Sequence, residues 1–170
     1  MTKPRVLILS WEYPPIVEGG LARHVRKLSE QLVATDSAEV HVLTRGDDTS
    51  APEEEMDGVH VHRVVEPSRP RDLSEFITWI EHMNSDLLAA GVELGDRYDF
   101  DLVHGHDWLV ASAGDHLAKR FRCPLVMTVH ATEYGRHQGW VQDHPQSHIH
   151  GVERWMTNRA DRVIACSAYM

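Results

Sequence analysis

Glycine and polar residues follow the first apolar segment of the chain, and their types suit them to bind an oxygen-rich ligand. Glu12, Tyr13 and the pair Gly19-Gly20 come after the apolar run Val6–Leu9. Two adjacent glycines at the start of a helix leave backbone N–H groups uncovered, and the positive end of the helix dipole favours a phosphate or a sugar oxygen there. The same glycines could instead only form a tight turn. The chemistry expected at this place is anion or sugar binding.

Two later apolar runs also end in groups that can do chemistry. The first is followed by His104, His106 and Asp107, and the second by His130, Thr132 and Tyr134. Imidazole and carboxyl groups can hydrogen-bond sugar hydroxyls and can stabilise positive charge that develops at an anomeric carbon. His104 and His106 flank Gly105, as paired metal ligands often do, but no further ligand follows at a suitable spacing, so we expect no metal site. His130 could also be a core histidine that is bonded to a backbone carbonyl.

The hydrophobic pattern indicates an α/β protein. Strands are expected near residues 6–9, 39–44, 59–64, 102–104, 125–130 and 162–166, and they alternate with helices near 20–34, 73–90, 109–121 and 151–159. The first, fifth and sixth strands are continuous apolar runs, which is typical of strands buried on both faces. The pattern predicts a Rossmann-like, doubly wound parallel sheet of about six or seven strands with helices on both faces. In the commonest strand order the first and fourth strands are neighbours, so the polar strand ends should meet in one crevice.

The connecting segments carry charged residues and histidines that we expect at the surface. The acidic segment 46–58 is expected to be a solvated loop. His60 and His62 alternate with valines, and we expect an exposed structural pair because no third metal ligand is evident nearby. Segment 131–150 lacks periodicity, and we expect a long loop that covers the crevice or contacts an acceptor. Its histidines are expected to form a hydrated surface: His137, His144, His148 and His150.

Length and composition limit the classes of function. A chain of 170 residues fits a single domain over residues 1–170. It has no apolar run close to membrane-spanning length and no signal-type cleavage site near its start, so we expect a cytoplasmic protein without an integral membrane segment. The net charge of −9 argues against nucleic acid and anionic membranes as partners. Cys123 and Cys166 lack the CxxC spacing and are expected to be reduced and structural.

Four segments, taken in order, resemble one known family. They are WEYPPIVEGGLARHV, LVHGHDW, VMTVHATEYG and ERWMTNRADRVIACS. They are similar to the N-terminal domain of retaining glycosyltransferases with the GT-B fold, within the glycogen and starch synthase-like group. The resemblance covers essentially the whole chain. It implies that residues 1–170 are the acceptor-side domain, that a C-terminal nucleotide-sugar domain is absent from this chain, and that the chain alone is inactive.

The resemblance also implies an activity and roles for individual residues. The implied reaction moves a glucosyl unit from a nucleotide sugar, ADP-glucose in the first place, to a glucan or sugar-phosphate acceptor, and it needs no cofactor. By the same resemblance His130 and Asp107 are the catalytic residues, and Gly19 and Gly20 lie against the donor. The other groups at the three strand ends are expected to bind substrate: Glu12, Tyr13, His106, Thr132 and Tyr134.

Two positions depart from the family pattern, and two other functions stay open. Glu18 stands where classical glycogen synthases have a lysine, and Ala131-Thr132 stands where they have Asn-Leu, which favours a related transferase with a different acceptor. A non-catalytic module that binds a sugar or sugar phosphate is the first alternative. An NAD(P)-binding domain is the second, but it expects G-x-G-x-x-G after the first strand and an acidic residue at the end of the second, where this chain has Thr44-Arg45-Gly46.

Overall fold

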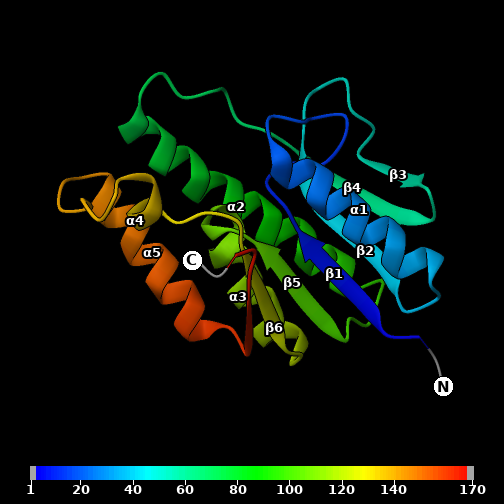
Figure 1. The fold of residues 1–170 in the computed structure, drawn as a ribbon. Helices are drawn as coiled ribbons and strands as arrows, with labels where there is room; N and C mark the ends of the chain where they lie inside the picture. The colour runs from blue at the N-terminus through cyan, green and yellow to red at the C-terminus, as the bar shows by residue number, and fades with distance from the viewer. Residues whose placement is uncertain (1–2, 168–170) are drawn as a thin grey trace.

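The computed structural model describes residues 3–167, which form one sheet of seven strands with helices packed on it (Figure 1). The strand order is β3-β4-β2-β1-β5-β6-β7, and every neighbouring pair is parallel except β3 and β4. The strands are β1 (Arg5–Leu9), β2 (Glu39–Gly46), β3 (Glu53–Met56), β4 (Val59–Val65), β5 (Leu102–His106), β6 (Leu125–Val129) and β7 (Arg162–Ala165). The helices are α1 (Gly20–Ala34), α2 (Leu73–Gly95), α3 (Ala111–Phe121), α4 (Glu133–Arg136) and α5 (Gln146–Arg159), with a 3₁₀ turn, η1, at Trp108–Val110.

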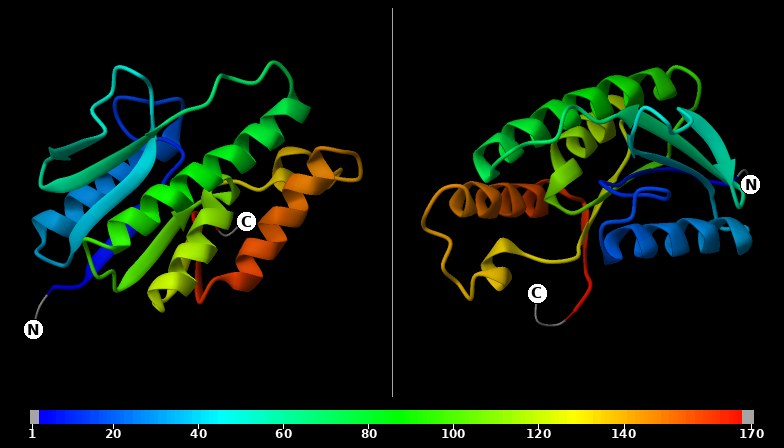
Figure 2. Two further views of the ribbon diagram at one scale, coloured as in Figure 1. Left: turned by 180° about the vertical axis from the view of Figure 1, so that it is seen from behind. Right: turned by 90° about the horizontal axis from the view of Figure 1, so that it is seen from above.

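Both faces of the sheet carry helices, as the sequence predicts (Figure 2). Alternate residues of a strand point to opposite faces, so β1 divides its side chains between two apolar clusters. Val6 and Ile8 pack with Val25 of α1 on one face. Leu7 and Leu9 belong to a larger cluster on the other face, to which α2, α3 and α5 contribute. The doubly wound arrangement is therefore confirmed.

Strand β1 occupies the middle of the sheet, between β2 and β5. Its last residue, Leu9, pairs with Leu43 on one side and with Gly105 on the other. Parallel strands end at a common edge, so the segments that follow β1, β5 and β6 meet there. The predicted neighbour relation of the first and fourth sequence strands, now β1 and β5, is confirmed.

The prediction of a solvated loop over 46–58 is wrong for Glu53–Met56, which form the antiparallel edge strand β3. Its backbone pairs with β4, with Glu53 opposite His62. Two of its acidic side chains have cationic partners: Glu53 lies 2.5 Å from Arg97, and Glu54 lies 2.5 Å from Arg63. Three consecutive glutamates have low strand propensity, so the sequence alone predicts no strand here. The strand forms because cross-strand hydrogen bonds and these ion pairs offset that low propensity.

The connection 131–150 is also more regular than predicted. Thr132 caps the short helix α4, because its hydroxyl accepts a hydrogen bond from the backbone N–H of Gly135 at 3.0 Å. Helix α5 begins at Gln146 rather than near residue 151. Its buried Ile149 and Met156 share one face, a spacing that the surrounding histidines obscured. His148 and His150 are therefore helical residues. Helix α2 likewise continues past the predicted end, to Gly95.

Within residues 3–167, none of the helices combines the length and the apolar character that crossing a membrane requires.

Candidate functional site

The carboxyl ends of β5 and β6 are joined by Asp107. Its Oδ1 accepts a hydrogen bond from the backbone N–H of His130 at 2.7 Å, and its own N–H donates to the carbonyl of Thr128 at 2.8 Å. Asp107 has φ of 63°, a value that costs an L-residue about 1–3 kcal/mol. The two hydrogen bonds hold this conformation. They fix the Asp107 carboxyl and the His130 backbone relative to one another at the predicted crevice.

Four imidazole rings gather beside Asp107. His104 and His106 lie on the same face of β5, as predicted, with ring centroids 4.3 Å apart. Nδ1 of His106 lies 3.0 Å from Nε2 of His130, and Nε2 of His104 lies 2.7 Å from the hydroxyl of Thr128. The fourth ring is His24 of α1, whose centroid lies 4.8 Å from that of His130 at an interplanar angle of 85°.

His24 is the residue that the sequence analysis missed. It lies four residues after Gly20, so both occupy the same face of α1. Once α1 is known to lie over the crevice, that four-residue spacing predicts that His24 faces it. Without the fold, His24 is one exposed helical histidine among several.

Burial keeps the rings of His104, His106 and His130 uncharged at neutral pH. Burial lowers the pKa of His130 to about 4, with a smaller contribution from the charge of His24, and it lowers the pKa of His104 to about 4. The pKa of the fully buried His106 is lowered further by the same cause. A neutral imidazole donates one hydrogen bond and accepts one, which suits it to sugar hydroxyls. Burial raises the pKa of Asp107, and the N–H of His130 opposes that shift.

The glycine pair is partly covered by the chain itself. One oxygen of Glu12, Oε2, accepts hydrogen bonds from the N–H groups of Glu18 at 2.7 Å and Gly19 at 2.8 Å. The expectation of uncovered N–H groups is therefore wrong for Gly19, because a carboxylate of the protein occupies the positive end of α1. Gly20 differs: a Cβ atom added there would meet nothing within 4 Å. The helix start attracts an anion as predicted, and Glu12 is the one present.

Glu18 is tied to two arginines that the sequence did not place here. Its Oε1 lies 2.7 Å from Nη2 of Arg45 and 3.1 Å from Nη2 of Arg69. Arg45 is buried at the end of β2, 4.5 Å from the centre of the Trp11 ring, and it also pairs with Glu66. The hydrogen bond from Arg45 lowers the pKa of Glu18. The family's lysine is missing before the glycines, yet one cation from β2 and one from the loop after β4 bind Glu18 at that position.

The other predicted site residues differ in accessibility. Tyr13 is 1% exposed, and its hydroxyl lies 3.1 Å from that of Ser29, so it belongs to the core under α1 in this conformation. Tyr134 is 55% exposed. Thr132 is engaged in capping α4. The substrate-binding roles of these residues stay predictions.

Helices α4 and α5 are held together by a buried carboxyl group. Both oxygens of Glu153 accept the N–H of Glu133, at 2.8 and 3.0 Å. Burial raises the pKa of Glu153 to about 7. Glu133 in turn pairs with Arg136 at 3.2 Å and with His137 at 3.0 Å. These contacts fix α4, which follows His130, against the rest of the domain.

Cys123 and Cys166 are both free, but they differ in position. Cys166 is exposed, and its sulfur lies 3.7 Å from Nδ1 of His130. Cys166 therefore borders the crevice, and the structural role expected of it stays a prediction.

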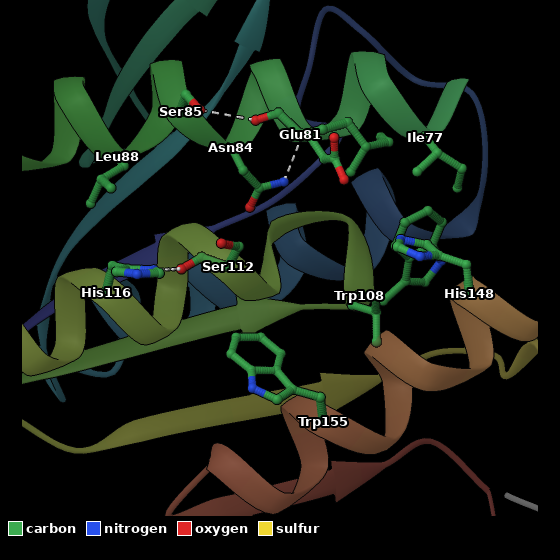
Figure 3. A pocket seen from close by; sticks show the side chains of 12 residues that line it. Ile77, Glu81, Asn84, Ser85, Leu88, Trp108, Ser112, His116, His148 and Trp155 are labelled. Carbon is green, nitrogen blue, oxygen red and sulfur yellow. Dashed lines mark hydrogen bonds between the residues drawn. The ribbon is translucent and has the colours of Figure 1, made fainter. Parts of the chain in front are cut away.

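A separate pocket of about 480 Å³ lies among α2, α3 and α5 (Figure 3). Trp108 and Trp155 face it together with Ile77, Asn84 and His148. Trp108 directly follows Asp107 in the chain, yet the pocket wall includes neither Asp107 nor His130. This pocket is distinct from the crevice.

A second histidine group lies on β2 and β4, toward the opposite end of the sheet. His60 and His62 share one face, as predicted, but His62 is buried and the expected exposure is wrong for it. The reason is His41 of β2, whose Nδ1 lies 3.0 Å from Nε2 of His62 and whose ring stacks on both others.

Comparison with known proteins agrees with this fold. Residues 19–170 match the family model described as Glycosyl transferase 4-like domain. The chain is 40% identical over 180 residues to a protein named Glycogen synthase of Mycobacterium tuberculosis (strain H37Rv), covering 98% of this chain and 43% of that protein. It is 30% identical over 176 residues to a D-inositol 3-phosphate glycosyltransferase of Mycobacteroides abscessus, covering 95% of this chain and 39% of that protein. Sucrose-phosphate synthase from Thermosynechococcus elongatus has the same fold, with a TM-score of 0.72 at 20% identity over 95% of this chain and 42% of that one.

These findings define an N-terminal half of a GT-B fold. The chain belongs to the glycosyl transferase 4-like family, which confirms the resemblance seen in the sequence. It spans only 39% to 43% of the length of the two relatives named here.

Proposed function

We propose that this chain is the acceptor-side domain of a retaining glycosyltransferase that moves a glucosyl unit from a nucleotide sugar to a glucan or sugar-phosphate acceptor. ADP-glucose is the proposed donor. The relation to a glycogen synthase at 40% identity supports glucosyl transfer. The length of the relatives supports a second domain, which would bind the nucleotide and complete the cleft.

The observation that carries this proposal is the coupling of Asp107 to His130. The 2.7 Å hydrogen bond between them aligns a carboxyl group and a neutral imidazole at one strand edge, beside the start of α1. A sugar held there could accept a hydrogen bond from His130 and lie near the negative charge of Asp107. The Asp107 carboxylate would stabilise the positive charge that develops at the anomeric carbon as the bond to the donor phosphate breaks.

The start of α1 is the proposed place of the donor diphosphate. A Cβ atom added at Gly20 would meet nothing within 4 Å, so there is open space beside this residue, and the helix end carries partial positive charge. Glu12 now accepts the N–H groups of Glu18 and Gly19. Because two anions cannot share these donors, the Glu12 carboxylate has to move when the diphosphate binds.

The acceptor is proposed only as a class. One named relative acts on an inositol phosphate by its name, and the other is named for glycogen, so both a sugar phosphate and a glucan are supported. Glu18 binds Arg45 and Arg69, and these arginines could serve a phosphate group if Glu18 turned away. A cytoplasmic location stays a prediction from the sequence.

The test is an activity assay of the full-length protein with ADP-glucose. Glycogen and a set of sugar phosphates serve as acceptors, and the anomeric configuration of the product is read by NMR. We expect an α-linked product from the α-linked donor, and no turnover by residues 1–170 alone. Sugar binding without transfer by the full-length protein would favour the non-catalytic binding module instead, and reduction of NAD or NADP would favour the dinucleotide alternative.

A further inference from the structure

Three histidines from three separate elements converge at the crevice. They are His24 of α1, His106 at the end of β5 and His130 after β6, and one possible ligand atom of each lies within 4.8 Å of the other two. His24 is exposed at the helix surface, while His106 is buried. The three-histidine cluster therefore combines one accessible side chain, His24, with two side chains at strand ends, His106 and His130.

The spacing of these nitrogens suits a small cation with nitrogen ligands. Tetrahedral zinc has Zn–N bonds of about 2.0–2.1 Å, which places its ligand nitrogens about 3.4 Å apart. Nδ1 of His106 and Nε2 of His130 are already 3.0 Å apart. The ring of His24 stands nearly perpendicular to that of His130 and can turn, because its side chain is exposed.

His106 and His130 already bring two ring nitrogens together. Nδ1 of His106 and Nε2 of His130 are joined by a hydrogen bond, so one of the two nitrogens carries the proton between them. A metal ion can take the place of that proton and bind both nitrogens once the proton is released. Nε2 of His106 lies on the other side of the ring and takes no part in this site.

The surrounding charge favours a cation at this cluster over the second histidine group of the protein. Here the Asp107 carboxyl is hydrogen-bonded to the backbone of His130. In the second group, Glu39, His41 and His60 have similar spacing. There the Arg5 guanidinium binds Glu39 through two hydrogen bonds, at 2.7 and 3.0 Å. A metal ion at Glu39 would lie beside that fixed positive charge.

We propose that His24, His106 and His130 form a binding site for a divalent transition-metal ion of the zinc type, and that the bound ion blocks sugar transfer. The blocking part rests on the proposed function, because it assumes that a sugar must reach His130. Imidazole ligands favour Zn²⁺, Co²⁺ and Ni²⁺ over the oxygen-seeking Mg²⁺. The site departs from the expectation of no metal site, which considered only ligands close in sequence to His104 and His106.

Calorimetric titration with ZnCl₂ after chelator treatment tests the site without any sugar. We expect one site in the unaltered protein, with binding weakened by about 100-fold in His24→Ala and in His24→Gln, because even outer-shell changes cost 10–100-fold in metal proteins. The matched control is His60→Ala, from the second group, which should bind zinc as the unaltered protein does. Co²⁺ should give the visible absorption of a tetrahedral complex, and Mg²⁺ should give no heat.

Several results would overturn the site: no zinc binding, equal binding by His24→Ala, or loss of binding in His60→Ala alone. Circular dichroism of each variant excludes unfolding as the cause, and His24 is exposed, so both of its variants should fold. For the second part, zinc should lower the transfer rate of the full-length protein and a chelator should restore it. Zinc binding with an undiminished rate would refute blocking, whereas zinc binding by a protein that transfers no sugar would overturn the proposed function and not the site.

Discussion

Replacing Gly20 with alanine adds one methyl group at the first residue of α1. The added Cβ would meet nothing within 4 Å, and Gly20 has no positive φ that an alanine would strain. Alanine favours helix over glycine by about 0.5–1 kcal/mol in a helix interior, and by less at a terminus. We therefore expect the free energy of unfolding to stay the same or to rise by up to about 1 kcal/mol.

The effect on activity should be of opposite sign. The methyl group would occupy the open space in which we place the donor diphosphate, so the phosphate oxygens could not approach the backbone N–H closely. Losing one charge-assisted hydrogen bond costs about 1.5–3 kcal/mol. Since 1.4 kcal/mol corresponds to a factor of ten, kcat/KM should fall by about 10-fold to 100-fold.

Gly105→Ala is the matched control from the same edge of the sheet. Its Cβ would lie 2.6 Å from Sδ of Met127 and 2.8 Å from Cε of the same side chain, so this core must shift. Overpacking of this kind costs about 1–3 kcal/mol of stability. Urea unfolding and steady-state kinetics of the full-length protein compare the two variants. An unchanged kcat/KM in Gly20→Ala, or a loss of stability as large as that of Gly105→Ala, would refute the reasoning.

Three further predictions concern charged side chains, each measured by urea unfolding. Glu153→Gln should stabilise the protein at pH 8 by up to about 3 kcal/mol, because a folded-state pKa of about 7 means that the charged carboxylate destabilises the folded protein at that pH. The gain should vanish as pH falls from 7 toward 4.5, where Glu153 becomes neutral. Equal stability of both proteins at pH 8 would contradict this. The hydrogen bond from Arg5 lowers the pKa of Glu39 to about 2, so its contribution is present above pH 4.5 and is lost as pH falls toward 2; Glu39→Gln should flatten that acid loss, and a parallel loss in both proteins would count against the pairing. Glu66→Ala removes one partner of the buried Arg45 and should lower the free energy of unfolding by about 2 kcal/mol. The loss should be smaller than for an arginine with a single partner, because Glu18 remains; no change would mean that Glu18 alone suffices to hold Arg45.

The layout of the sheet could be predicted because its signals are local and strong. Apolar runs such as Val6–Leu9 identify buried parallel strands, and the alternation with amphipathic helices defines the doubly wound order. The positions of His130 and Asp107 at adjacent strand ends then follow from the topology. The pairing of these residues at 2.7 Å agrees with that expectation.

The remaining features depend on contacts between residues far apart in the chain. The sequence of the edge strand β3 is typical of an acidic loop, and only the folded structure shows that Arg63 and Arg97 pair with its glutamates. The Glu12 carboxylate at the start of α1 comes from a loop that folds back on itself, which no spacing rule predicts. His24 joins the other crevice histidines only through the packing of α1 on the sheet.

The most direct test of the account is the turnover of His130→Ala in the full-length protein. His130 is half-buried at a strand end, so we expect kcat to fall by on the order of 100-fold or more while the free energy of unfolding changes by about 1 kcal/mol or less. His116→Ala, an exposed histidine of α3, serves as the control and should leave kcat unchanged. If His130→Ala instead turns over within about twofold of the unaltered protein, a difference worth only about 0.4 kcal/mol, His130 takes no part in sugar transfer and the proposed site is wrong.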